Sequence, residues 1–191
     1  MYKLYKYSCM LLFILIVFAV GNAGAEVRRE ASWVQPLEAP GLKNFYQVSP
    51  WLYRSEQPQR EGFITAEKMG IKTILNLRSM HSDKNETAGL RLNLVEVPIV
   101  TWSFDHEEIV RPLRVLAGAP RPILVHCQHG ADRTGLIIAL YRVVFEGWSK
   151  EAATREMLEG GYGFHAIWVN ITSYLDKVDV EKLKAQVLAD Q

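Results

Sequence analysis

The sequence predicts an α/β fold in which a central, mostly parallel sheet of four to five strands is flanked by helices. Two observations support this prediction. Short β-branched or apolar runs alternate along the chain with longer segments of helical periodicity, an order typical of a parallel sheet covered by helices. In addition, a polar, glycine-containing loop joins one of the expected strands to a strongly apolar helix within residues 123–146.

The first half of the pattern contains expected strands and helices in alternation. In order, these are two short strands within Phe45–Arg54 on either side of Pro50, a helix over Pro58–Met69 that ends at Gly70, a strand over Ile71–Leu77, a weak helix over Ser82–Leu90 and a strand over Leu92–Ile99. Gly70 is suited to the left-handed conformation that often ends a helix. The run at 71–77 is apolar and β-branched, as expected of a strand buried on both faces.

The second half follows a loop at Thr101–Asp105 and is richer in helices. In order, it contains a helix over Glu107–Ala117, a strand over Pro122–His126, a polar loop over Cys127–Asp132, an apolar helix over Thr134–Glu146 closed by Gly147, a helix from its cap Ser149 to Glu159, an amphipathic helix over Phe164–Val178 and a frayed helical tail. Serine is a favoured helix N-cap and glycine a favoured C-cap, so these residues mark the expected helix ends.

Length and composition exclude several classes of protein. The chain has 191 residues, of which 49% are hydrophobic, with 22 Lys and Arg against 21 Asp and Glu. This composition is not that of a disordered chain, a collagen-like fibre or a strongly basic nucleic-acid binder. The length favours a single domain of ordinary size. We expect no nucleic-acid partner, and we expect a monomer.

Residues 1–25 have the order of a secretory signal peptide. Lys3 and Lys6 precede the apolar run Met10–Val20, and small residues follow at positions 23 and 25. The run is shorter than the ~20 residues that a membrane-spanning helix needs. We therefore expect an exported protein, periplasmic or secreted. The alternative is an uncleaved N-terminal anchor, which would then be the protein's contact with a membrane.

Removal of residues 1–25 would leave 166 residues with a formal charge of −1 and a single cysteine, Cys127. Residues 26–44 contain Pro36, Pro40 and Gly41 and are interpreted as an irregular lead-in, so the folded domain is expected at 45–191. A single cysteine cannot form an internal disulfide. An unpaired thiol in an exported protein suggests that the thiol itself is used.

The segment Ile123–Gly135 (ILVHCQHGADRTG) carries the strongest chemical pattern. A buried strand ends at Cys127 and a helix begins near Arg133, so the loop between them presents backbone N–H groups and the positive end of a helix dipole to one point. Such a site favours an anion, and it favours the thiolate form of a cysteine. Arg133 can grip two phosphate oxygens at once, and Gly130 permits the tight turn.

The residues His126–Thr134 fill every fixed position of the H-C-x-x-G-x-x-R-[ST] signature. By this signature the chain resembles the protein-tyrosine and dual-specificity phosphatase superfamily, over residues 45–178. The strand ends Tyr53–Ser55 and Asn76–Arg78 are similar to those of the compact dual-specificity and the plant and fungal atypical branches. The resemblance implies that residues 45–191 are a dual-specificity-phosphatase-like catalytic domain.

The resemblance also implies a two-step mechanism. Cys127 would attack phosphorus and form a phosphocysteine, a carboxylic acid would protonate the leaving oxygen, and water would then release phosphate. His126 would orient the loop from behind, and Thr134 would hydrogen-bond the sulfur. Phosphate binding is assigned to the loop residues Gln128, His129, Gly130, Ala131, Asp132 and Arg133. The family needs no metal and no organic cofactor.

Two residues are candidates for the general acid. In the family the acid comes from a loop upstream of the signature, which favours Asp105, but Asp105 and Glu108 also have the spacing of a helix capping box. Asp132 directly precedes Arg133. If it pointed inward, burial beside a phosphate would keep it protonated, as an acid catalyst requires; if it pointed outward, it would complement the helix dipole. Glu107 and Glu108 are lesser candidates.

Four further side chains near these segments have ordinary structural interpretations. Arg54 and Arg78 end expected strands at the carboxyl edge of the sheet, where sites of α/β proteins collect. Each is nevertheless interpreted as a surface or ion-pair residue. His165 is interpreted as a helix-start or packing residue, and Trp102 as a half-buried aromatic side chain.

Three other functions are weighed as alternatives, and the complete H-C-x-x-G-x-x-R-[ST] string argues against the third. The first is a catalytically weak phosphate-binding module or pseudophosphatase, although a pure binder would not need a nucleophile. The second is a metal site of His126, Cys127 and His129, but neighbouring residues at a strand end point in opposite directions. The third is a sulfurtransferase of the rhodanese type. The sequence does not identify the substrate, which could be a phosphoprotein (at Tyr or at Ser and Thr) or an inositol phosphate or phosphoinositide.

Overall fold

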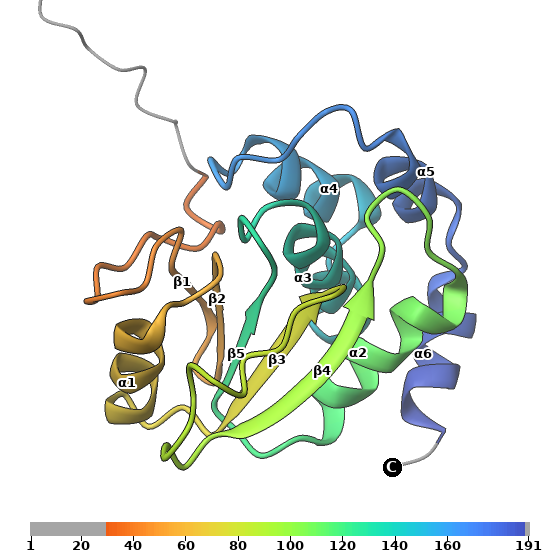
Figure 1. Ribbon diagram of the computed structural model, residues 1–191. Helices are drawn as coiled ribbons and strands as arrows, with labels where there is room; N and C mark the ends of the chain where they lie inside the picture. Colours follow the sequence, from red (N-terminus) through yellow and green to blue (C-terminus); the bar gives the residue numbers. More distant parts are fainter. Residues whose placement is uncertain (1–29, 190–191) are drawn as a thin grey trace, which may run out of the picture.

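The computed structural model describes residues 30–189, so the signal-peptide or anchor interpretation of residues 1–25 lies outside the described residues. Within that range a sheet lies between layers of helices (Figure 1). The elements are β1 (Tyr46–Ser49), β2 (Leu52–Ser55), α1 (Arg60–Lys68), β3 (Thr73–Arg78), β4 (Asn93–Ile99), α2 (His106–Gly118), β5 (Ile123–His126), α3 (Asp132–Phe145), α4 (Lys150–Glu159), α5 (Val169–Lys177) and α6 (Val180–Leu188).

The five strands form one sheet in the order β1-β2-β5-β3-β4. Only the β1–β2 pair is antiparallel, and β5 lies parallel to both β2 and β3. The predicted mostly parallel α/β fold is therefore confirmed. At the carboxyl edge, His126 of β5 is in register with Ser55 of β2 and Asn76 of β3. The loop that begins at Cys127 consequently leaves the centre of the sheet between two neighbouring strand ends.

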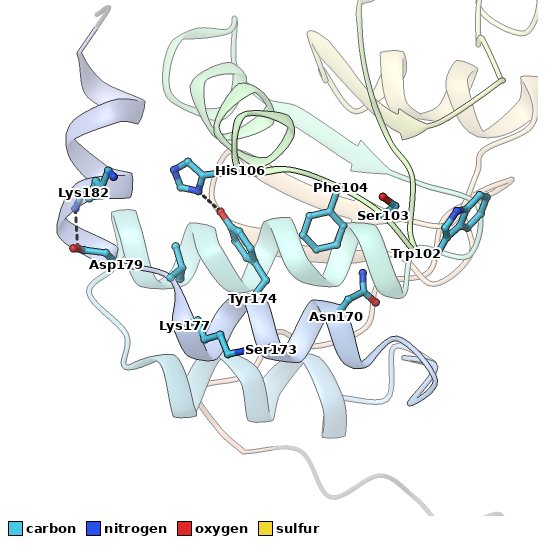
Figure 2. A pocket seen from close by; sticks show the side chains of 11 residues that line it. Trp102, Ser103, Phe104, His106, Asn170, Ser173, Tyr174, Lys177, Asp179 and Lys182 are labelled. Atoms are coloured by element: carbon cyan, nitrogen blue, oxygen red, sulfur yellow. Dashed lines mark hydrogen bonds between the residues drawn. The ribbon is translucent and has the colours of Figure 1, made fainter.

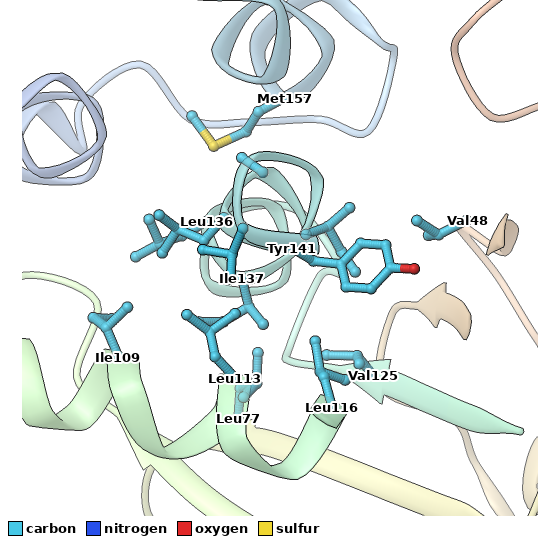
Figure 3. Close-up of a cluster of buried hydrophobic side chains, with 14 of the residues drawn as sticks. Val48, Leu77, Ile109, Leu113, Leu116, Val125, Leu136, Ile137, Tyr141 and Met157 are labelled. Carbon is cyan, nitrogen blue, oxygen red and sulfur yellow. The ribbon is translucent and has the colours of Figure 1, made fainter. Parts of the chain in front are cut away.

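Both faces of the sheet are covered because alternate strand residues are apolar on each side. On one face, Ile74 and Leu124 pack with Phe63 of α1. On the other face, side chains of β3 and β5 pack against α2 and α3, as Figure 3 shows for Leu77 and Val125. Helix α3 is buried almost all round, since α4 covers the side that faces away from the sheet (Figure 1). The start of this helix is therefore rigidly placed.

The prediction of a weak helix over Ser82–Leu90 is wrong, because this segment forms successive turns. The Asp83 carbonyl accepts hydrogen bonds from the backbone N–H and the hydroxyl of Thr87, but the helical pattern goes no further. Gly89 has a φ of +80°, outside the helical region. The segment is instead fixed by the buried carboxylate of Asp83, which points towards β5.

Two predictions about the C-terminal third need correction. The amphipathic helix expected over Phe164–Val178 begins only at Val169, because residues 164–168 form an irregular segment with Trp168 at the N-cap. The expected frayed tail is an ordered helix, α6. Its Leu183 and Val187 are fully buried in the main core, and α6 packs against α2. The sequence pattern of α6 was too short to show this tertiary contact.

Residues 30–44 lack regular helices and strands, as expected, but they are packed onto the domain. Trp33 and Leu42 are only 4% and 6% exposed, and the backbone N–H of Val34 donates to the buried Glu156 carboxylate of α4 at 3.3 Å. The packed unit therefore begins before residue 45. Among the helices of residues 30–189, none combines the length and the apolar character required to cross a membrane.

Candidate active site

The loop between β5 and α3 has its carbonyl groups turned towards the surrounding protein. Three successive carbonyl oxygens accept hydrogen bonds from residues outside the loop. The backbone N–H of Gln57 donates to the Gln128 carbonyl at 3.2 Å, Asn44 Nδ2 to the His129 carbonyl at 2.8 Å, and Arg54 Nη2 to the Gly130 carbonyl at 2.6 Å. These bonds fix the orientation of three consecutive peptide planes.

The backbone N–H groups of the same loop are left free for a ligand. Within residues 30–189, the N–H groups of residues 128–134 donate to no other group of the protein. Ala131, the N-cap of α3, makes no side-chain capping bond, so the first turn of the helix is also uncapped. Unpaired N–H groups at a helix N-terminus attract an anion. The loop is therefore a cradle for a phosphate-sized anion, with Cys127 at its first position.

Gly130 is required by the backbone of this loop. Its φ is +66°, a conformation that L side chains rarely adopt. A Cβ atom at this position would lie 2.5 Å from the carbonyl carbon and oxygen of Ser55, at the end of β2. Glycine therefore allows both the tight turn and the close packing of the loop against the neighbouring strand.

Arg54 is a functional residue that the sequence analysis interpreted as a surface or ion-pair residue. Its side chain is buried, with 1% exposure, and its guanidinium lies 3.7 Å from the centre of the Tyr162 ring. Burial lowers the pKa of Arg54, and the charge of Tyr162 partly opposes this effect. Since its Nη2 atom holds the Gly130 carbonyl, Arg54 positions the loop. The sequence signal that could have identified Arg54 was the similarity of Tyr53–Ser55 to the strand ends of the family.

Arg133 lies in the first turn of α3, half-buried, with Nη1 3.4 Å from the Ile99 carbonyl. Its buried Nε atom makes no hydrogen bond within residues 30–189. Arg78 lies nearby: burial first, and then the charge of Arg133, lower the pKa of Arg78, while Asp83 and Cys127 act in the opposite direction. Two guanidinium groups are therefore within electrostatic range of the loop.

Thr134 is fully buried, but the expected hydrogen bond to the Cys127 sulfur is not formed in this structure. The hydroxyl has no partner within the described part of the chain. Cys127 itself is a free cysteine and is 2% exposed. A buried hydroxyl in the first turn of α3 remains available to an acceptor at the loop.

His126 lies beneath the loop, away from solvent. Its Nε2 atom is 2.8 Å from Asp83 Oδ2, and the other oxygen of that carboxylate accepts a bond from Gln57 Nε2 at 2.7 Å. Burial alone would raise the pKa of Asp83, but the hydrogen bonds and charges of its partners, His126 first, lower it below the ordinary value. The loop is thereby connected to the turn segment at 82–90 and to Gln57 in the segment that follows β2.

Asp105 forms the helix cap that its spacing predicted. Its Oδ1 atom accepts from the backbone N–H of Glu108 at 2.8 Å, and its own N–H donates to the Glu108 carboxylate at 2.9 Å. Asp105 is exposed to solvent. Burial first and the charge of Asp105 second raise the pKa of Tyr174 to about 12, so the Asp105 carboxylate lies on the side of α5. Glu107 lies 3.3 Å from Arg114.

Asp132 is held by His165. The carboxylate accepts a hydrogen bond from the backbone N–H of His165 at 2.9 Å, and the His165 ring atom Nδ1 lies 2.9 Å from Oδ2. Asp132 is 7% exposed, whereas the His165 side chain is half exposed. The aspartate therefore faces the irregular segment before α5. Sequence reasoning missed this role of His165, because the two residues are far apart along the chain.

The structure does not bring the side chains of His126, Cys127 and His129 together as a metal site, because His126 faces the core and Asp83.

The loop at 101–105 is held in place by contacts with α5. Asn170 Nδ2 donates to the Thr101 carbonyl at 2.9 Å, and His106 Nδ1 lies 2.7 Å from the Tyr174 hydroxyl (Figure 2). An open groove of about 620 Å³ lies along this contact.

Trp102 is one of the residues that line this groove (Figure 2). It is 70% exposed rather than half-buried, which corrects the sequence-based interpretation of this side chain. Thr101 at the start of the loop and His106 at the start of α2 both contact α5, so the exposed indole is not needed to hold the loop in place.

Comparison with known proteins identifies the family. The family model described as the tyrosine phosphatase family matches residues 41–183. The chain belongs to this family. It is 32% identical over 177 residues to the dual specificity protein phosphatase TpbA of Pseudomonas aeruginosa, covering 90% of this chain and 80% of TpbA. It is also 32% identical over 117 residues to the inositol diphosphatase SIW14 of Saccharomyces cerevisiae, covering 56% of this chain and 41% of SIW14.

Solved structures of the same two relatives agree with this result. The structure of a Cys-to-Ser variant of TpbA in complex with phosphotyrosine is similar with a TM-score of 0.76 at 30% identity, covering 85% of this chain and 99% of that one. The catalytic core of SIW14 with citrate has a TM-score of 0.66 at 24% identity, covering 77% and 92%, which shows the shared fold. The chain is thus a cysteine-dependent phosphatase, a phosphoric monoester hydrolase of the tyrosine and dual-specificity type.

Proposed function

We propose that this tyrosine-phosphatase-family chain hydrolyses phosphotyrosyl proteins through a phosphocysteine on Cys127. The observation that carries the proposal is the arrangement of the signature loop. Its carbonyls are tied outward, its N–H groups are free, and Cys127 and Arg133 stand at its two ends. The relative TpbA is named a dual specificity protein phosphatase, and a variant of it binds phosphotyrosine, which supports this substrate class.

In the first step the Cys127 thiolate attacks phosphorus. The S–P bond forms while the P–O bond to the tyrosine breaks, and the leaving oxygen takes a proton from a carboxylic acid. The N–H groups of residues 128–133 and the Arg133 guanidinium stabilise the charge on the equatorial oxygens. In the second step the same carboxylate takes a proton from water, and the water oxygen attacks phosphorus while the S–P bond breaks and phosphate is released. The thiolate is regenerated, with the buried Thr134 hydroxyl as a hydrogen-bond donor.

We assign the general acid to Asp105. Both oxygens of the Asp132 carboxyl group are engaged by His165: Oδ1 accepts from the backbone N–H, and Oδ2 lies 2.9 Å from ring atom Nδ1. Asp132 therefore faces His165 and is not free to donate a proton to a leaving oxygen. Asp105 is exposed, and it accepts only the capping bond from Glu108 among the hydrogen bonds of the described residues. A carboxylate in this position can release its cap and turn towards the substrate, because Glu108 also holds the helix end through the Asp105 backbone N–H.

An inositol phosphate is the second candidate substrate. The observation that favours it is the second guanidinium, Arg78, within electrostatic range of Arg133 and the loop. A ligand with several phosphates could bind both arginines at once. The similarity to the inositol diphosphatase SIW14 supports the same class.

Export is the proposed location. The order of charge, apolar run and small residues in residues 1–25 supports a cleaved signal peptide, with an uncleaved anchor as the alternative. Phosphoproteins outside the cytoplasm would then be the accessible substrates. N-terminal sequencing of the protein recovered from its native compartment tests this, and a first residue close to position 26 is the expected result.

A substrate panel tests the proposed function. We expect turnover of p-nitrophenyl phosphate and of a phosphotyrosyl peptide, and slower turnover of a phosphoseryl peptide and an inositol phosphate. Cys127→Ser should lower each rate by a factor on the order of 10⁴ or more, because no nucleophile remains. The variant should still bind the phosphotyrosyl peptide. Faster turnover of the inositol phosphate than of the phosphotyrosyl peptide would show that the substrate is an inositol phosphate and not a phosphotyrosyl protein. Binding without turnover in the unmodified protein would indicate a phosphate-binding module.

A further inference from the structure

Three metal-ligating side chains meet at the rim of the signature loop. They are His129 of the loop, Asp132 at the start of α3, and His165 of the irregular segment before α5. Phosphate binding, as proposed above, uses the backbone N–H groups of His129 and Asp132, so their side chains are available for a second purpose. Among the described residues, this is the one group of three or more such side chains close enough to hold a metal ion.

The geometry of the group suits one ion. Each residue offers one ligand atom, and these atoms all lie within 4.8 Å of one another. His165 Nδ1 is already 2.9 Å from Asp132 Oδ2, and the two imidazole rings lie 5.5 Å apart between centroids. Ligands of one Zn²⁺ ion at about 2.0–2.2 Å from the metal lie roughly 3–3.5 Å from one another. Small side-chain rotations at the exposed histidines would close the site.

The chemistry of the three ligands points to a transition metal. Two imidazoles and a carboxylate bind zinc in sites that keep an open coordination position. The Asp132 carboxylate is already oriented, because the backbone N–H of His165 donates to its Oδ1 atom at 2.9 Å. Such a bond to a ligating carboxylate strengthens a metal site. His129 and His165 are exposed, so an ion can enter from solvent.

The nearby arginines oppose a cation only weakly. Arg54 is buried below the loop and directed at the Gly130 carbonyl, and Arg133 directs Nη1 at the Ile99 carbonyl. The negative charge of Asp132, itself one of the three ligands, offsets part of the repulsion between these groups and a cation. Because the histidines face solvent, mobile ions and water screen the remaining repulsion.

We propose that His129, Asp132 and His165 bind one divalent transition-metal ion, with Zn²⁺ as the best fit, and that this ion inhibits the phosphatase. His129 belongs to the loop and Asp132 directly follows the loop, whereas His165 lies in the separate segment before α5. Coordination therefore fixes the loop to the segment before α5 and places a divalent charge beside the phosphate cradle. The open coordination position can take an oxygen of bound phosphate, which would slow its release.

The first test measures binding. We would titrate the full chain carrying Cys127→Ser with Zn²⁺ by calorimetry, because this variant removes the thiol as a ligand. One equivalent should bind. Adding His165→Asn should weaken binding by at least about tenfold, while adding His106→Asn, a histidine paired with Tyr174 elsewhere, should not. Absence of binding to Cys127→Ser, or equal affinity with and without His165→Asn, would overturn the proposal.

The second test measures inhibition, and it rests on the proposed phosphatase activity, whereas the binding test does not. Turnover of p-nitrophenyl phosphate is followed against Zn²⁺ concentration, each variant relative to its own metal-free rate. His165→Asn should raise the half-inhibitory concentration at least about tenfold, His106→Asn should leave it unchanged, and a chelator should restore activity. Equal inhibition of all three proteins would mean that the ion acts elsewhere, for example on the Cys127 sulfur, and would reject the inhibitory site.

Discussion

Asp105 and Asp132 are both acidic, and their hydrogen-bond partners give them different roles. Asp105 caps α2 at the surface, and Asp132 is nearly buried and holds His165. Sequence spacing predicted the cap at Asp105, because the capping box is a local pattern. It could not predict the bond to His165, because that contact depends on how the segment before α5 folds back over the loop.

Asp105→Asn tests the assignment of the acid. We expect kcat for a phosphotyrosyl peptide to fall about 10²- to 10⁴-fold. The loss should be much smaller for an aryl phosphate whose leaving group is so acidic that it needs no proton. Thermal stability should change little, because asparagine is also a favoured N-cap. The measurement is kcat across a series of aryl phosphates with leaving groups of increasing basicity.

Asp132→Asn is the matched variant for this series. Asparagine keeps an acceptor for the His165 backbone N–H, so the segment before α5 should stay in place. We expect no added dependence on the leaving group. If Asp132→Asn shows the dependence and Asp105→Asn does not, the acid is Asp132 and our assignment is wrong.

Among the residues of the loop, the sequence predicted the roles that follow from the signature alone. Cys127, Gly130 and Arg133 lie within one short segment of the sequence, and in the structure this segment is the loop from β5 into the first turn of α3. Arg54 and Arg78 could not be assigned in this way. Each ends a different strand, and only the parallel register of β2, β5 and β3 brings these strand ends to the loop.

At the scale of elements, the turn segment at 82–90 and β5 are joined by one buried contact. His126 of β5 and Asp83 are both almost fully inaccessible to solvent, and the carboxylate also binds Gln57. Local propensity suggested a helix for this segment. The segment forms turns instead, because the bonds of the buried Asp83 carboxylate to His126 and Gln57 fix its backbone.

Asp83→Asn tests the strength of this contact. We expect the free energy of unfolding to fall by about 2 kcal/mol at neutral pH, because a hydrogen bond to a charged buried group is lost. Chemical denaturation, followed by circular dichroism, measures this difference. The variant should also keep less phosphatase activity, since His126 supports the loop.

The pH dependence of the same difference follows from the lowered pKa of Asp83. A carboxyl group whose pKa is lower in the folded than in the unfolded state stabilises the fold above its unfolded value of about 3.9. That stabilisation is lost as pH falls through the folded value. The difference in free energy of unfolding between wild type and Asp83→Asn should therefore become smaller below about pH 4. An equally wide gap at about pH 2.5 and about pH 5 would contradict this account.

At the scale of the whole molecule, the expected order of strands and helices was sufficient to predict the fold class. It was not sufficient to predict the extent of the packed unit. The lead-in at 30–44 is irregular in sequence and structure, and α6 is short, yet both contribute buried side chains, among them Trp33 and Leu183. Such segments are stabilised by tertiary burial rather than by local propensity, so the periodicity of their sequence gives little indication that they pack onto the domain.

A comparison of two shortened chains tests the role of the lead-in. A chain that begins at residue 45 should unfold at lower temperature than one that begins at residue 30. We expect the free energy of unfolding to fall by at least about 3 kcal/mol, the size typical for removing a buried large aromatic side chain. Trp33→Ala in the longer chain serves as the matched control and should reproduce much of the loss. Equal melting temperatures for both chains would show that the packed unit starts at residue 45.

Phosphatase activity through this loop requires the Cys127 sulfur to accept the phosphoryl group. The most direct measurement is rapid acid quenching of the protein during turnover of an aryl phosphate, followed by peptide mass spectrometry. We predict a peptide that contains Cys127 and carries one phosphoryl group, and no such peptide from Cys127→Ser. A phosphoryl group found instead on a histidine of the site, or undiminished turnover by Cys127→Ser, would contradict the account.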